Sequence, residues 1–208
     1  MKLEEIKFLT TNPKKAKDFS DFGLGVQSFD KEIMEVLSPN VETVVLHKAR
    51  DTELNSIVVE DTALTVDGAD FFGTQIKHVW EEIAEDESFH QHKAVWEVSL
   101  CMKKDDKFYI ATGVTEGILK YPALDIGYHF DRIFAIPNQE GQYQHFELFT
   151  QAEKQEIGPR FKALQLLRDA ILSNDFSKLK VIDENNVEDW NAEYQDEKKE
   201  TKKYSFFL

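Results

Sequence analysis

The sequence predicts an α/β fold built on a mixed β-sheet, and two patterns in the chain carry this prediction. Short apolar runs typical of strands alternate with amphipathic segments typical of helices over residues 6–61. Farther along, residues 94–102 alternate between polar and apolar side chains. A short polar stretch follows, and residues 108–119 then form a second strand-like segment. The second pattern predicts a long antiparallel hairpin, which makes the sheet mixed.

The first elements follow from their local signals. Residues 6–10 form an apolar run, which predicts a buried strand. Asn12 and the proline after it start a helix over residues 14–22, because Asn is a preferred N-cap and Pro suits the first helical position. We expect a second strand at residues 26–29 and a second helix at residues 41–54.

The remaining elements are predicted in the same way. Residues 56–61 are a continuous apolar run that ends in two acids, which indicates a strand covered on both faces. Residues 74–92 have a weak helical pattern, and residues 132–136 are expected to form another strand. A Gly-Pro step opens a helix over residues 160–173.

The chain has 208 residues, and the sequence divides it into one domain over residues 1–173 and a charged extension over residues 174–208. The extension is weakly periodic and ends in aromatic residues. Three arrangements are open for it: partial disorder, a surface helix, or an arm docked through its aromatic end.

Composition limits the function. The formal charge of −14 argues against binding a nucleic acid polymer, which needs clustered Lys and Arg. The single cysteine, Cys101, excludes an intramolecular disulfide and fits a reducing compartment. The first residues do not resemble a signal peptide, and no apolar stretch reaches the roughly 20 residues of a membrane helix. We therefore expect a cytoplasmic protein.

The segment FLTTNPKKAK carries the first chemical signal. It leads from a strand through a polar turn into a capped helix, whose N-terminal N–H groups suit a phosphate. Thr10, Thr11 and Asn12 add side-chain hydrogen-bonding groups, and Lys14 or Lys15 adds a positive charge. The alternative is an ordinary capped surface helix with solvated lysines.

The second signal is the acidic pair Glu60-Asp61. Acids at the end of a strand lie where α/β proteins place ligand sites, and Mg²⁺ favours one or two carboxylates together with substrate phosphates. A carboxylate here could also take a proton from an attacking water. The alternative is a pair of solvent-facing acids that cap the next element.

A third signal is the loop GYHFDRIF, in which Tyr128 and Phe130 lie beside Asp131. Aromatic rings next to an acid can hold a nucleobase by stacking and edge hydrogen bonds. The alternative is an aromatic plug of the core.

Four cations complete the candidate set. Lys154 and Arg160, near the start of the last helix, could face a phosphate or a base. Lys48 and Lys77 are single lysines in apolar surroundings, and each could reach a substrate phosphate or extend to water.

Taken together and in their order along the chain, the segments from about residue 6 to residue 172 resemble the motifs of the inosine triphosphate pyrophosphatase family. That family's Thr/Ser-Gly-Asn-x-x-Lys loop is matched at Thr10, Asn12 and Lys15, with Thr11 at the glycine. Its Glu-Asp-Thr/Ser-x-Leu motif is complete at residues 60–64.

Further motifs match in part. The aromatic loop of the family is similar to residues 127–134, and its Ser-His-Arg motif retains Arg160 but has Gly158-Pro159 at the Ser-His positions. In the family the His-Arg pair helps to read the 6-keto edge of the base. Proline has no N–H and cannot replace histidine as a donor, so the base preference stays open.

The resemblance implies a two-lobed, mixed-sheet fold with a central cleft, a homodimer, and a Mg²⁺-dependent enzyme that cleaves nucleoside triphosphates of non-standard purines (ITP, dITP, XTP) to monophosphate and pyrophosphate. It implies that Asp61 is the general base or a metal-linked acid and that Glu35 and Glu60 hold the metal. The implied metal ligands are Glu35, Glu60 and Asp61; the phosphate ligands are Lys15, Lys48, Lys77 and Lys154; the base pocket is Tyr128, Phe130, Asp131 and Arg160.

Three other functions stay open at this point. One is a pyrophosphatase of altered base specificity, and another is a non-catalytic nucleotide-binding or regulatory protein. The third is an interaction protein whose acidic, aromatic-ended tail contacts a partner.

Overall fold

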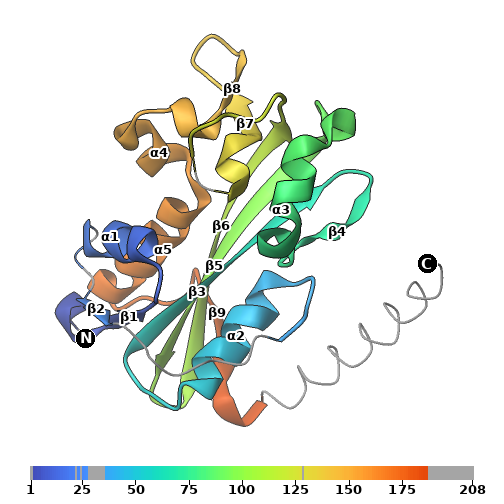
Figure 1. The fold of residues 1–208 in the computed structure, drawn as a ribbon. Helices are drawn as coiled ribbons and strands as arrows, with labels where there is room; N and C mark the ends of the chain where they lie inside the picture. The colour runs from blue at the N-terminus through green and yellow to red at the C-terminus, as the bar shows by residue number, and fades with distance from the viewer. Residues whose placement is uncertain (1, 22, 24, 28–35, 128, 187–208) are drawn as a thin grey trace, which may run out of the picture.

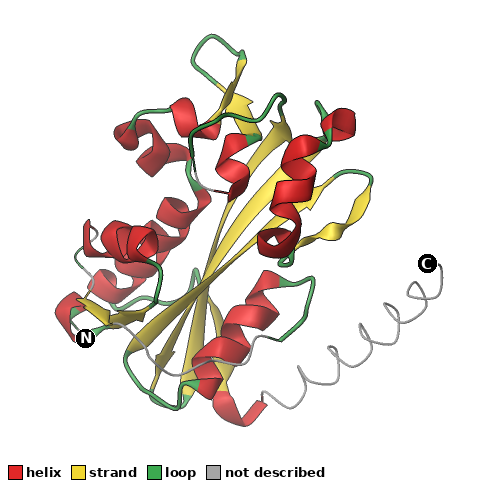
Figure 2. Ribbon diagram, viewed as in Figure 1, coloured by secondary structure: helices red, strands yellow, loops and turns green. Residues whose placement is uncertain are grey.

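The computed structural model describes residues 2–21, 23, 25–27, 36–127 and 129–186. Within these ranges the chain forms a nine-stranded mixed sheet with helices on both faces (Figures 1 and 2). The strands are β1 (Lys7–Leu9), β2 (Gly25–Gln27), β3 (Ile57–Val66), β4 (Ala69–Gly73), β5 (Lys93–Lys104), β6 (Lys107–Leu119), β7 (Phe134–Pro137), β8 (Tyr143–His145) and β9 (Lys180–Asp183). The helices are α1 (Pro13–Asp21), α2 (Val41–Asp51), α3 (Ile76–Glu85), α4 (Gln151–Ile157) and α5 (Pro159–Ser173).

The sheet confirms the predicted α/β class. The path runs β2-β1-β3-β5-β6-β7-β8, with β4 added to β3 and β9 added to β6. β1 is parallel to β2 and to β3, and the other pairings are antiparallel. The predicted hairpin is β5–β6, which forms the long axis of the molecule (Figure 1).

Two apolar clusters lie on opposite faces of this sheet. On one face, Phe161 and Leu164 of α5 pack with Val98 and Leu100 of β5, and Phe19 of α1 joins the same cluster. On the other face, α2 packs against β3, β5 and β6 through a second cluster that includes Val45, Val59 and Cys101. Because the two layers use alternate residues of the same strands, the central strands are buried on both sides where α2 covers the sheet.

Several predicted boundaries were wrong. The third strand does not end at its two acids, because β3 continues to Val66 and pairs with β5 along its full length. The second helix ends at Asp51, and Glu53 beyond it has a positive φ of 57°. The predicted helix over 74–92 is α3 followed by a 3-10 turn (Glu87–Phe89), and β7 begins at Phe134 because a 3-10 turn occupies His129–Arg132.

The N-terminal prediction is confirmed. The side chain of Asn12 accepts hydrogen bonds from the backbone N–H groups of Lys14 and Lys15, at 2.9 and 3.3 Å, and Pro13 occupies the first position of α1. This cap satisfies two of the N–H groups that a helix start leaves without partners.

The chain beyond α5 returns to the sheet. β9 pairs with the start of β6, so the first part of the charged extension is docked as an edge strand. Residues 187–208, with the aromatic end, lie outside the described residues. The division at residue 173 therefore stays a prediction.

Gly113 of β6 provides a test of the packing between the sheet and α5. A methyl group at this position would overlap the carbonyl oxygen of Pro159, which is backbone and cannot turn away. We expect Gly113→Ala to lower the free energy of unfolding by about 1–3 kcal/mol, measured by urea denaturation. The neighbouring Val114→Ala, at a position 40% exposed, should change it by less than about 0.5 kcal/mol; equal effects would show that the contact is not tight.

Candidate active site

The polar turn after β1 lies beside the acidic pair of β3. Phe8 of β1 is paired in parallel with Val58 of β3, so the chain that continues from Thr10 leaves the sheet next to Glu60. The Thr10 hydroxyl accepts the Asn12 N–H at 3.0 Å, which fixes the turn, while Thr11 is exposed. The predicted phosphate loop and the predicted acids therefore meet at one edge of β3.

This edge of β3 is open over a short stretch. Within the described residues, β1 covers Ile57 and Val58, and β4 covers the strand again from Leu64 to Val66. β5 occupies the opposite edge throughout. Positions 59–63 thus have a paired strand on one side only.

Glu60 is the centre of a buried ion-pair network. Its carboxylate accepts from Lys15 Nζ at 2.9 Å and from Arg160 at 2.9 Å (Nε) and 3.2 Å (Nη2). The third guanidinium nitrogen of Arg160 donates to Asp18 at 2.8 Å. The Glu60 side chain is 0% exposed, and the network joins α1, β3 and α5.

The network determines the charge of Glu60. Burial alone would raise the pKa of this carboxyl, but the positive charges of Arg160 and Lys15 lower it to about 2. Burial would likewise lower the pKa of the Arg160 guanidinium, and the carboxylates of Glu60 and Asp18 raise it above its ordinary value. Glu60 and Arg160 are thus both held in their charged forms.

Asp61 belongs to the other face of the sheet. Its carboxylate is 2.8 Å from Lys48 Nζ of α2, and it also accepts the Thr62 N–H at 2.7 Å. Consecutive side chains of a strand point to opposite faces, and here Val58 joins the α5 cluster while Val59 joins the α2 cluster. Glu60 and Asp61 therefore point away from each other.

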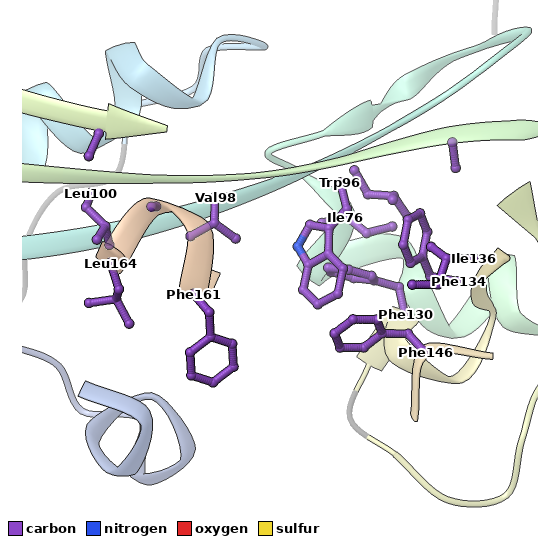
Figure 3. Close-up of a cluster of buried hydrophobic side chains, with 14 of the residues drawn as sticks. Ile76, Trp96, Val98, Leu100, Phe130, Phe134, Ile136, Phe146, Phe161 and Leu164 are labelled. Atoms are coloured by element: carbon purple, nitrogen blue, oxygen red, sulfur yellow. The ribbon is translucent and has the colours of Figure 1, made fainter. Parts of the chain in front are cut away.

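A cavity of about 300 Å³ lies on the α1/α5 side of β3. Its apolar wall contains Trp96, Phe130 and Phe146, and Figure 3 shows the indole ring of Trp96 between strand β5 and the two phenyl rings. The ring centroids of Trp96 are 5.1 Å from Phe130 and 4.9 Å from Phe146, in edge-to-face contact. The indole N–H donates to Thr62 Oγ1 at 2.9 Å, which holds the indole ring in place.

Charged groups surround the mouth of this cavity. Asp131 lies 3.3 Å from Lys14 Nζ, and burial raises the pKa of its carboxyl against the opposing charges of Lys14 and Arg160. Lys154 Nζ pairs with Glu147 at 3.0 Å. The polar lining includes Asn12, Lys14, Lys15, Asp18, Asp131, Glu147, Gln151, Lys154 and Arg160.

The predicted residues thus fall into two groups. Asn12, Lys15, Phe130, Asp131, Lys154 and Arg160 line the cavity, and Glu60 pairs with two of them. Asp61 and Lys48 form the second group, around the edge of β3. Glu35, Tyr128 and the side chain of Lys77, which belongs to α3, lie outside what the structure describes.

Sequence reasoning missed several residues of the cavity, among them Asp18, Trp96 and Glu147. Asp18 had a usable signal, because it follows Lys15 by three positions on α1 and so shares its face. Trp96 had a signal in the alternation of β5, which places it with the buried Val98. Glu147 is in a short 3-10 turn (Phe146–Leu148) with no periodic pattern, and nothing in the sequence distinguished it.

The chain belongs to the Ham1 family, whose model matches residues 6–170. This match bears out the resemblance drawn from the motifs.

Two relatives extend the comparison. A dITP/XTP pyrophosphatase of Ignicoccus hospitalis is 30% identical in an alignment 177 residues long, which covers 77% of this chain and 93% of that protein. The structure of the Staphylococcus aureus Ham1 protein superposes with a TM-score of 0.61 at 16% identity, over 81% of this chain and 99% of that one, and confirms the fold. Among the described helices, none combines the length and the apolar character needed to cross a membrane.

The buried charge of Glu60 predicts an acid-dependent loss of stability. The ordinary pKa of this carboxyl is 4.5, and in the folded chain it is about 2. Because the folded pKa is the lower one, the contribution is complete above about pH 4.5 and is lost as the pH falls towards about 2, a total of about 3 kcal/mol.

Urea denaturation between about pH 5 and about pH 3 checks this effect. The free energy of unfolding of Glu60→Gln should fall less steeply with decreasing pH than that of the wild type, because the amide does not titrate. Parallel curves for the two proteins would contradict the assigned pKa.

Proposed function

We propose that this protein is a nucleoside triphosphate pyrophosphatase that acts on non-standard purine nucleotides and releases the monophosphate and pyrophosphate. The observation that carries the proposal is the contact of Lys15, from the turn after β1, with Glu60 beside an aromatic-walled cavity. Membership of the Ham1 family and the similarity to a dITP/XTP pyrophosphatase support it.

The nucleoside occupies the cavity in this proposal. A volume of about 300 Å³ lies at the lower end of the range of small-molecule sites. Phe130 and Trp96 provide apolar contact for a base, with Tyr128 as a further proposed aromatic. Asp131 and Lys154 provide an acceptor and a donor near the mouth, where polar edges of the base can be read.

The phosphates follow the open edge of β3. The N-terminus of α1 offers N–H groups, and Thr10, Thr11 and Asn12 offer polar side chains beside it. Lys15 on one face and Lys48 on the other lie on either side of the same stretch of strand. We infer that a triphosphate passes over this edge and reaches Asp61, with Lys77 as a further proposed phosphate ligand.

The donor chemistry at this edge fits Mg²⁺, which prefers carboxylate oxygens and usually needs only one or two of them besides phosphates and water. The described residues contain no group of three or more His, Cys, Asp or Glu side chains arranged for a metal. We propose Asp61 and Glu35 as ligands. The sequence also predicts that Glu60 binds this ion. The side chains of Glu60 and Asp61 point in opposite directions, which does not favour a shared metal ion.

The residues divide the reaction between them. Asp61 accepts a proton from the water that attacks the α-phosphorus, and Lys48 holds the Asp61 carboxylate at 2.8 Å and stabilises its charge. Lys15 stabilises negative charge on the leaving pyrophosphate. A bound Mg²⁺ ion supplies further charge stabilisation on the phosphate oxygens. The homodimer and the cytoplasmic location stay predictions.

A substrate panel tests the function directly. With Mg²⁺, purified protein should release pyrophosphate from ITP, dITP or XTP, and chelation of the metal should abolish this release. Pro159 provides no N–H donor in the cavity wall. We therefore expect the enzyme to discriminate less strongly against GTP than an enzyme whose cavity wall forms hydrogen bonds with the base. Orthophosphate as the first product, or no turnover of any nucleotide, would refute the proposal.

Asp61→Asn tests the assignment of the base. The amide cannot accept the proton, so kcat should fall by at least about 100-fold while the urea midpoint changes little. Asp67→Asn, in the exposed turn after β3, is the matched control and should retain wild-type kcat. Normal turnover by Asp61→Asn would mean that another group takes the proton.

A further inference from the structure

A row of three polar side chains crosses the sheet beneath α2. Asp61 of β3 is paired directly with Ser99 of β5, and Ser99 is paired directly with Thr112 of β6. Directly paired residues point to the same face, so all three side chains face α2. Ser99 is 0% exposed, and its hydroxyl lies 2.8 Å from that of Thr112.

α2 contacts both ends of this row. Glu42, in its first turn, accepts a hydrogen bond from Thr112 Oγ1 at 2.9 Å, and Lys48, in its last turn, contacts Asp61 at 2.8 Å. Glu42 and Lys48 are six positions apart and leave the helix on different flanks, Glu42 towards β6 and Lys48 towards β3. α2 is therefore fixed at each end.

The hydrogen bonds in the row have a defined direction. A hydroxyl has one proton to donate, and that of Thr112 goes to the Glu42 carboxylate. Ser99 must then be the donor in its bond with Thr112. Both hydroxyl groups thus donate in the direction of Glu42 and away from Asp61.

Strand β9 contributes a second partner to Glu42. Lys180 is paired with Ile110 of β6, two positions from Thr112 on the same face, and its Nζ contacts the second oxygen of Glu42 at 2.9 Å. This strand lies beyond residues 6–170, the part of the chain that the family model matches. Glu42 therefore receives one partner from the family core and one from the extension.

We propose that Glu42 is a positioning residue, held by Thr112 and Lys180, that fixes α2 along its axis and so sets Lys48 against Asp61. The start of the charged extension then contributes to the rate of the reaction although it does not touch the substrate. This inference rests on the proposed role of Asp61.

Two pairs of variants test it in the full chain. Thr112→Val removes the hydroxyl at nearly equal volume, and Thr112→Ser keeps it; Lys180→Met removes the charge, and Lys180→Arg keeps it. Lys178→Met, at an exposed lysine two residues away, is the control. The measurements are kcat and KM for the best substrate of the panel, and deuterium exchange of the amides of residues 41–51.

We expect Thr112→Val and Lys180→Met to lower kcat about tenfold, because small misplacements of a reacting group are costly, and to raise KM less than threefold. Amide exchange in α2 should be faster in both. Thr112→Ser, Lys180→Arg and Lys178→Met should stay within about twofold of the wild type.

Unchanged kcat with faster exchange would overturn the proposal by showing that the anchor is structural only. Unchanged exchange, or equal losses in the conservative variants and the control, would also overturn it. A wild-type chain without turnover would refute the proposed function instead, and the exchange rates would still decide whether Glu42 anchors the helix.

Discussion

The alternation of side chains along β3 is the constraint on which the rest of the site depends. Because successive residues of a strand face opposite layers, the adjacent acids Glu60 and Asp61 cannot share one environment. Glu60 faces α1 and α5 and pairs with Lys15 and Arg160, whereas Asp61 faces α2 and pairs with Lys48. The motif thus places the buried, ion-paired Glu60 and the proposed base Asp61 on two sides of a single strand.

Charge balance makes the buried side of this arrangement stable. Isolated buried charges are costly, but here two carboxylates and two cations neutralise each other with direct hydrogen bonds. All three side-chain nitrogens of Arg160 are engaged, by Glu60 and Asp18. Arg160 is therefore better placed to hold α5 against β3 than to read a base, which differs from the role implied by the family motif.

The sequence predicted most elements from α1 to the β5–β6 hairpin in their order, because caps, apolar runs and alternation are local signals, but it did not predict β4. It did not predict where β3 ends. An acid at an apolar strand's end and an acid within a longer strand have the same local pattern, and only the pairing with β5 over ten residues distinguishes them. β9 was missed for a related reason, since a short edge strand in a charged segment has little apolar periodicity.

The departure at Gly158-Pro159 has a structural cause that bears on base recognition. The Gly158 N–H caps α4 by donating to the Lys154 carbonyl at 2.9 Å, and Pro159 begins α5 at once. A Cβ atom at Gly158 would lie 2.6 Å from that carbonyl oxygen, so a serine does not fit unless α4 moves. The cavity wall at this junction consists of Gly158 and Pro159, which provide no side-chain donor. Under the proposed function, Asp131 and the Glu147–Lys154 pair are the polar groups of the wall that we expect to select among bases.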